Sequence, residues 1–147
     1  MKSENQVVLE FPSRSSNESF ARVAAAGFAM QLDPTLEELG DIKTAVSEAV
    51  TNAIIHGYPD CIGRIVMKLR IREGNVMEII VKDWGVGIAD VEQARKPMFT
   101  TGNDERSGMG FTIMESFMDT IMVKSAPHKG TTVTLKKRIS TRMGERK

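Results

Sequence analysis

The residues best suited to chemistry are an acid and an amide four positions apart, Glu48 and Asn52, within the stretch 47–57. Residues at this spacing lie on the same face of an α-helix, which makes one turn in about 3.6 residues. A carboxylate there could accept a proton, and an amide oxygen could bind a cation. Alone, the pair also fits an ordinary solvated face, because the opposite face of the predicted helix is apolar: Leu39, Ile42, Val46, Ala49, Val50 and Ala53.

Two loops that contain glycine could bring the backbone close to a ligand. Residues 83–88 follow a strand-like run, and Asp83 at its end could accept a hydrogen bond from an exocyclic amine. Gly85 and Gly87 leave room for a ligand where a Cβ atom would collide. Residues 107–111 begin a predicted helix, whose first N–H groups and positive dipole end attract anions. Taken alone, each loop is also compatible with a simple turn.

The segment 96–106 between these loops is polar, contains proline and glycine, and is long enough to form a lid over a ligand. Phe99 is expected to anchor one end of the lid. The candidate ligand contacts within it are Thr100, Thr101 and Arg106, of which Arg106 could reach a phosphate group.

Several kinds of site are excluded by what the sequence lacks. It has no Gly-x4-Gly-Lys-Ser/Thr phosphate loop, no Gly-x-Ser-x-Gly motif, and no zinc-like spacing of its two histidines and one cysteine. Cys61 cannot form an internal disulfide bond, which fits a reducing compartment. The 20 basic and 19 acidic residues nearly cancel, so direct nucleic-acid binding is not expected. Without a signal-like or membrane-spanning run, we predict a soluble, cytoplasmic protein with no membrane contact.

Two long helices are expected in the first half of the chain. The first is predicted to start with a capping box of Ser15 and Glu18 and to run to about residue 31. Arg22 points away from its core side and could contact a partner. The residues predicted to form its buried stripe are Phe20, Val23, Ala24, Gly27 and Phe28.

The second helix carries Glu48. Asp33 is its predicted N-cap, with Pro34 in the first turn, and Gly57 and Pro59 end it. A further helix is predicted at 110–117, and alternating apolar residues predict strands at 7–11, 64–72, 76–81, 120–125 and 131–137. This pattern indicates an α+β domain over 1–138, in which helices cover one face of a mixed or antiparallel sheet, followed by a basic tail at 139–147.

The three motifs together, in this order, resemble the N, G1 and G2 boxes of the GHKL ATPase superfamily. The resemblance extends over roughly residues 33–135. Neighbouring segments resemble the anti-sigma serine kinases of this superfamily, the sporulation branch more than the general-stress branch. The motifs that carry it are Glu48-x-x-x-Asn52, Asp83-x-Gly85-x-Gly87 and Gly108-x-Gly110.

This resemblance implies a fold, an activity and partners. The fold is a two-layer α/β sandwich of the Bergerat type that binds ATP or ADP with Mg²⁺. The activity is transfer of the γ-phosphoryl group to a serine of an anti-anti-sigma protein. The implied partners are that protein, a sporulation sigma factor that the kinase sequesters, and a second copy of the chain in a homodimer.

The resemblance also implies roles for single residues. Glu48 would be the general base and Asn52 a Mg²⁺ ligand. Asp83 would bind the adenine amine, Gly87 would let the base approach, and Thr132 would add a polar contact near the base. The phosphates would be held by the N–H groups of Gly108, Met109 and Gly110, and by Arg106.

Two other interpretations stay open. One is a binding module that holds ATP and a sigma factor without transferring phosphate, although such a module would have no need of Glu48 as a base. The other is a detached histidine-kinase catalytic domain. No dimerisation helix with a phosphoacceptor histidine is present, because His56 follows the N box and His128 lies beside a predicted hairpin turn.

Overall fold

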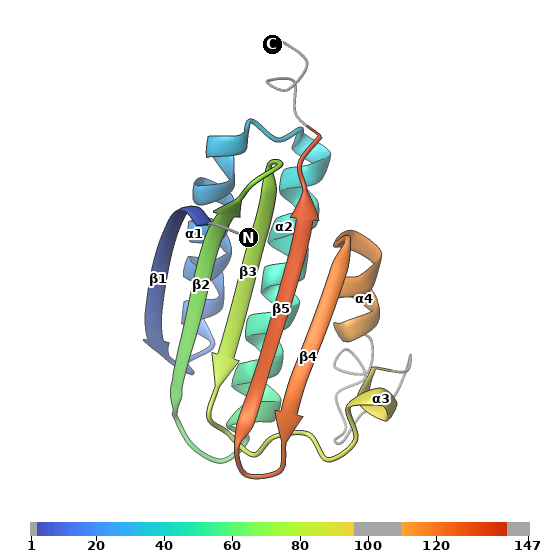
Figure 1. The fold of residues 1–147 in the computed structure, drawn as a ribbon. Coiled ribbons are helices and arrows are strands. Elements are labelled where there is room, and N and C mark those ends of the chain that lie inside the picture. Colours follow the sequence, from blue (N-terminus) through green and yellow to red (C-terminus); the bar gives the residue numbers. More distant parts are fainter. Residues whose placement is uncertain (1–2, 96–109, 141–147) are drawn as a thin grey trace.

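The computed structural model describes residues 3–95 and 110–140 (Figure 1). The helical elements are α1 (Ser16–Ala29), a 3-10 turn (Met30–Leu32), α2 (Leu36–Asn52), a π-helical turn (Ala53–Gly57), α3 (Val91–Ala94) and α4 (Gly110–Phe117). The strands are β1 (Ser3–Pro12), β2 (Arg64–Arg72), β3 (Val76–Asp83), β4 (Thr120–Ala126) and β5 (Gly130–Arg138). All five predicted strands and the helix at 110–117 are therefore present, whereas the 3-10 turn, the π-helical turn and the short α3 were not predicted.

The strands form one sheet in the order β1-β2-β3-β5-β4, and all neighbouring strands are antiparallel. One face of this sheet is covered by α1, α2 and α4, with α2 between the other two (Figure 1). The predicted α+β class and two-layer architecture are confirmed. None of the helices in 3–95 and 110–140 is long and apolar enough to cross a membrane.

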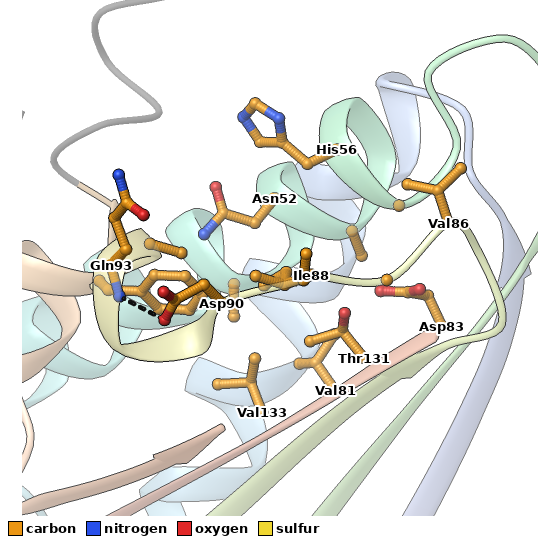
Figure 2. Close-up of a pocket in the computed structure, with 17 residues that line it drawn as sticks. Asn52, His56, Val81, Asp83, Val86, Ile88, Asp90, Gln93, Thr131 and Val133 are labelled. Atoms are coloured by element: carbon orange, nitrogen blue, oxygen red, sulfur yellow. Dashed lines mark hydrogen bonds between the residues drawn. The ribbon is translucent and has the colours of Figure 1, made fainter. Parts of the chain in front are cut away.

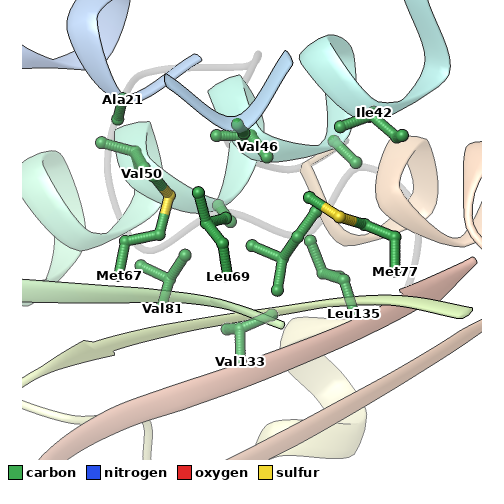
Figure 3. Packing of buried hydrophobic residues seen from close by; sticks show 14 of the residues in the cluster. Ala21, Ile42, Val46, Val50, Met67, Leu69, Met77, Val81, Val133 and Leu135 are labelled. Atoms are coloured by element: carbon green, nitrogen blue, oxygen red, sulfur yellow. The ribbon is translucent and has the colours of Figure 1, made fainter. Parts of the chain in front are cut away.

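The core lies between α2 and the central strands (Figure 3). Ile42, Val46 and Val50 of α2 are fully buried. Burying a side chain of this size stabilises the fold by roughly 1.5–3 kcal/mol, so this contact fixes the rotation of α2 about its axis. Glu48 and Asn52, on another face of the helix, stay partly exposed. The strand residues that complete the core include Met67, Leu69, Met77, Ile79, Val81, Val133 and Leu135.

The start of α2 differs from the prediction. Thr35 is the N-cap: its hydroxyl accepts a hydrogen bond from the backbone N–H of Glu38 at 3.1 Å. The Glu38 carboxylate in turn accepts from the N–H of Thr35 at 2.9 Å, which completes a capping box. Asp33 instead has a left-handed conformation, with φ of 49°, and ends the preceding 3-10 turn. The predicted cap at Asp33 is therefore wrong.

The cap and the buried face of α1 also differ from the prediction. Ser15 occupies the N-cap position but makes no side-chain cap hydrogen bond, and Glu18 pairs with Arg22 at 3.5 Å. Phe20 and Val23, predicted to be buried, are 60% and 64% exposed. The buried side chains are mostly small, which lets α1 pack closely against α2: Ala21, Ala25, Phe28 and Ala29.

The two described residues that follow β5, Ile139 and Ser140, also contact the rest of the domain. Ile139 is 1% exposed, and Ser140 donates to the Glu38 carboxylate from its backbone N–H at 2.9 Å and its hydroxyl at 2.8 Å. Burial raises the pKa of Glu38, but the hydrogen bonds from Thr35 and Ser140 outweigh it and lower the pKa. This carboxylate thus ties the chain after β5 to the start of α2. The rest of the predicted tail lies outside the described residues.

Candidate functional site

A cavity of about 420 Å³ opens where the end of α2 faces the loop that follows β3 (Figure 2). This volume is within the range of small-molecule sites. Much of its wall is apolar and includes Val81, Ile88, Phe111 and Val133. The polar side chains that line it are Asn52, His56, Asp83, Asp90, Gln93 and Thr131. An apolar slot with a few polar groups is suited to a flat heteroaromatic ligand.

Asn52 lies at the last position of α2 and lines the cavity. After it the chain widens into the π-helical turn, a geometry found often at functional sites. This turn keeps His56 on the cavity side (Figure 2). The start of α4 packs against the amide, because a Cβ atom on Gly110 would lie 2.9 Å from Asn52 Nδ2. Two of the predicted motifs therefore meet at this point.

The loop after β3, residues 83–88, is called the Asp83 loop here. Gly85 comes so close to the π-helical turn that a Cβ atom would lie 1.8 Å from the carbonyl oxygen of Gly57. Gly87 has φ of 77°, and its Cβ atom would lie 1.9 Å from the carbonyl oxygen of Ala126. Both neighbours are backbone atoms, so these two positions require glycine. The spacing of the two glycines thus lets the loop pass between the π-helical turn and the end of β4.

Asp83 is a carboxylate at the floor of the cavity, with only 4% of its surface exposed. Its Oδ1 accepts a hydrogen bond from the N–H of Gly85 at 2.9 Å. Burial raises the pKa of Asp83, and backbone hydrogen bonds from Gly85 and Thr131 only partly oppose this. Among residues 3–95 and 110–140, Asp83 has no cationic partner, and burying such a carboxylate costs stability, which is typical of a residue kept for ligand binding.

The cavity brings together several of the predicted site residues. Asn52, Asp83 and Gly87 line it, and Gly85 supports the loop beside it. Glu48 lies one turn before Asn52 on α2 and is not among the lining residues. Arg22 lies on α1. The predicted residues Thr100, Thr101, Arg106, Gly108 and Met109 lie outside the described residues.

Of the two neighbouring threonines, Thr131 and the predicted Thr132, it is Thr131 that lines the cavity. The cavity is lined by Thr131, which pairs with Asp83 across the sheet, whereas Thr132 pairs with Lys82. Successive side chains of a strand point to opposite faces, so a shift by one residue moves the hydroxyl from one face to the other.

The sequence analysis missed other lining residues. His56 follows Asn52 by four positions, so the spacing that linked Glu48 to Asn52 could have found it. Asp90 caps α3 by accepting from the N–H of Gln93 at 3.1 Å, a local signal that is readable from an Asp-x-x-Gln pattern. α3 has only four residues, too few for a periodic pattern to reveal.

The fold and this cavity define a class of protein, and comparison with known families gives the same class. Residues 11–137 match the family model of the histidine kinase-like ATPase domain. The chain therefore belongs to the histidine kinase-like ATPase family, that is, to the GHKL superfamily, and its full-length relatives within it bear the name anti-sigma F factor.

Three of these relatives show how far the similarity extends. The anti-sigma F factor of Geobacillus kaustophilus is 59% identical over 92% of this chain and 94% of its own length. That of Bacillus subtilis is 54% identical over the same shares. That of a Thermoanaerobacter species is 56% identical over 96% of this chain and 99% of its own.

Solved structures agree on the fold. A Mycobacterium tuberculosis structure of RsbU and RsbW domains superposes with a TM-score of 0.66 at 18% identity. It covers 92% of this chain, which in turn spans about a third (32%) of that protein. The mycobacterial sensor histidine kinase MprB superposes with a TM-score of 0.57 at 15% identity, over 89% of this chain and 97% of its own.

Proposed function

We propose that the protein is an anti-sigma factor with an ATP-dependent serine kinase activity. It binds and inhibits a sporulation sigma factor, and it phosphorylates and so inactivates the anti-anti-sigma protein that opposes it. The names of its relatives support the anti-sigma role. The observation that supports the kinase activity is the cavity that both Asn52 and Asp83 line, with Glu48 one turn before Asn52 on α2.

The adenine base occupies the apolar slot beside the Asp83 loop. The Asp83 carboxylate accepts a hydrogen bond from the exocyclic amine, and Gly87 lets the base approach the backbone. Thr131, whose side chain lines the same cavity, replaces Thr132 as the nearby hydroxyl. Gly110 lies at the start of α4, where N–H groups favour phosphate, and the proposal extends to Gly108, Met109 and Arg106 just before it.

Mg²⁺ fits the donor set at Asn52. Among the described residues, no three His, Cys, Asp or Glu side chains come together as a metal cage. Mg²⁺ needs no such cage, because it keeps several waters and is commonly held by one or two protein oxygens and the phosphates of a substrate. The Asn52 amide oxygen would be its protein ligand, and the ion would neutralise charge on the phosphates.

Glu48 acts as the general base in this proposal. The seryl oxygen of the anti-anti-sigma protein forms a bond to the γ-phosphorus while the bond from that phosphorus to the β–γ bridging oxygen breaks. ADP leaves with that electron pair, and the Glu48 carboxylate takes the seryl proton. A glutamate is ordinarily ionised at neutral pH, so the base needs no special activation.

The partner surfaces are proposed from α1 and β1. β1 forms an edge of the sheet, and exposed apolar side chains lie on it and on α1 nearby, among them Val8, Phe20 and Val23. An edge strand with exposed apolar neighbours favours pairing with another chain, so we place the homodimer contact there. Arg22, on the same helix, is the proposed contact to the sigma factor. A sigma factor as partner implies a cytoplasmic protein.

The function is tested by incubating the protein with γ-labelled ATP, Mg²⁺ and the anti-anti-sigma protein. Label on a serine of that protein supports the kinase. Label on a histidine, or on an aspartate of a receiver domain, would instead indicate a histidine-kinase catalytic domain. If ATP binds and no partner is labelled, the protein is a nucleotide-dependent binding module.

Replacing Asn52 by Ala should lower the affinity for Mg-ATP by about tenfold or more while leaving metal-free ATP binding nearly unchanged. The reason is that the amide is proposed to hold the ion, whereas the base is held elsewhere. Titration calorimetry with and without Mg²⁺ measures both affinities. An unchanged Mg²⁺ dependence in this variant would remove Asn52 from the metal site. The control is Thr44→Ala, an exposed position on the same helix.

A further inference from the structure

We infer that Tyr58 and Ser125 are positioning residues that hold the two ends of the Asp83 loop, and so set the selectivity for adenine over guanine. The inference rests on the proposed nucleotide site. Neither side chain lines the cavity, so each acts through the loop and not by touching the base.

Tyr58 holds the first end of the loop. Its hydroxyl donates to the carbonyl oxygen of Arg64 at 2.6 Å and accepts from the backbone N–H of Trp84 at 2.7 Å. Burial raises the pKa of Tyr58, which keeps the hydroxyl protonated and able to donate. The ring is itself fixed against Gly63, where a Cβ atom would lie 2.2 Å from the Tyr58 ring. One hydroxyl thus bridges the start of β2 and the residue directly after Asp83.

Ser125 holds the other end from β4. Its hydroxyl oxygen accepts from the backbone N–H of Ile88 at 2.7 Å. The same oxygen lies 3.0 Å from the carbonyl oxygen of Gly130 and 2.8 Å from the hydroxyl oxygen of Thr131. Ser125 therefore links the end of the loop to the strand that supplies the cavity hydroxyl.

Between these ends the N–H of Gly85 donates to Asp83 Oδ1 at 2.9 Å, and two contacts between backbone groups hold Val86. The N–H of Val86 donates to the carbonyl oxygen of Gly57 at 2.9 Å, and the N–H of His128 donates to the carbonyl oxygen of Val86 at 2.6 Å. These contacts fix the middle of the loop. The Asp83 carboxylate is held by the N–H groups of Gly85 and Thr131, and the two hydroxyls hold the backbone of the residues next to Asp83 and Gly87. Both residues must be placed closely to bind an amine on a flat base.

The test compares Tyr58→Phe and Ser125→Ala with the wild type in equilibrium binding of ATP and GTP. Each variant should weaken ATP binding by about three- to tenfold, the range for one net hydrogen bond, with little change in GTP binding. Amide hydrogen exchange by NMR gives a second readout. Exchange should rise at Trp84 in Tyr58→Phe and at Ile88 in Ser125→Ala, with the other amide unaffected in each case.

The control is Ser116→Ala, which removes an exposed hydroxyl bonded to the carbonyl oxygen of Thr112 at 3.0 Å. It should change neither the ratio of the ATP and GTP affinities nor the hydrogen exchange of the Trp84 and Ile88 amides. If the ratio of ATP to GTP affinity stays unchanged in both loop variants, including through equal losses of affinity for the two nucleotides, the inference is overturned. If the wild type binds neither nucleotide, the proposed function fails instead, and unchanged exchange at Trp84 and Ile88 in the variants would still overturn the two contacts.

Discussion

Replacing Glu48 by Gln should reduce phosphoryl transfer to the anti-anti-sigma protein by about 10²–10⁴-fold, the range for loss of a general base. Gln has nearly the same shape but cannot accept the seryl proton. Because Glu48 is not among the residues that line the cavity, the affinity for ATP should stay within about twofold of wild type. Initial rates of label transfer and calorimetric titration with ATP measure the two quantities separately.

Glu37→Gln is the matched control, because it makes the same change at an exposed position in the first turn of the same helix. It should alter neither the rate nor the affinity. If Glu48→Gln keeps more than about a tenth of the wild-type rate, another group accepts the proton. If it loses ATP binding instead, Glu48 belongs to the nucleotide site and not to the chemical step.

The central part of the site could be predicted because it depends on short spacings. Glu48 and Asn52 are four residues apart on a helix with a clear apolar face, so their shared face follows from helix geometry. Asp83 ends the largely buried strand β3, and Gly85 and Gly87 follow within the next four residues. That Asn52 and Asp83 line one cavity, by contrast, follows only from the resemblance, because no local pattern shows which strand end faces which helix end.

The errors arise where two local signals compete. Asp33-Pro34 and Thr35 with Glu38 both predict a helix start, and the second is used because it satisfies two backbone donors at once. In α1, a stripe with Phe20 and Val23 and one with Ala21 and Ala25 both fit a helical period. The stripe of small residues is buried because it permits close approach to α2, a tertiary effect that hydrophobicity alone cannot predict.

The choice between Thr131 and Thr132 depends on the register of the sheet. The side of a strand residue is fixed by where the strand enters the sheet, and β5 enters at Gly130, whose φ of 93° sets the phase. A sequence pattern with adjacent threonines gives no preference between the two faces. The structure resolves the choice through the pairing of Thr131 with Asp83.

Replacing Asp83 by Asn should weaken ATP binding by about 10–100-fold while stabilising the folded protein at neutral pH. Loss of a charged acceptor for the adenine amine costs roughly 1.5–3 kcal/mol, which gives that range of affinity. Asn can still accept the hydrogen bond from Gly85, but it carries no charge that must be kept in a buried site. Binding of GTP, which lacks that amine, should change little.

The pH dependence of stability tests the same assignment in the free protein. Burial raises the folded-state pKa of Asp83 above its usual value of 3.8, so the folded state holds the proton more tightly than the unfolded chain. The stability of wild type relative to Asp83→Asn should therefore fall as the pH rises from about 3.8 through the folded-state pKa. Urea unfolding at intervals of about half a pH unit between pH 4 and pH 7 measures this difference in the free energy of unfolding.

Asp119→Asn provides the comparison, because Asp119 is an exposed carboxylate that also accepts one backbone N–H, from Arg138 at 2.7 Å. This variant should bind ATP as wild type does. ATP affinity left intact in Asp83→Asn would mean that the carboxylate does not contact the base. If the stability of wild type relative to Asp83→Asn instead rose with pH, burial would not be what governs the pKa of Asp83. The two measurements are independent, because a residue can cost stability when buried without reading a ligand. Only the loss of affinity combined with the gain in stability identifies Asp83 as a carboxylate retained for recognition of the adenine amine.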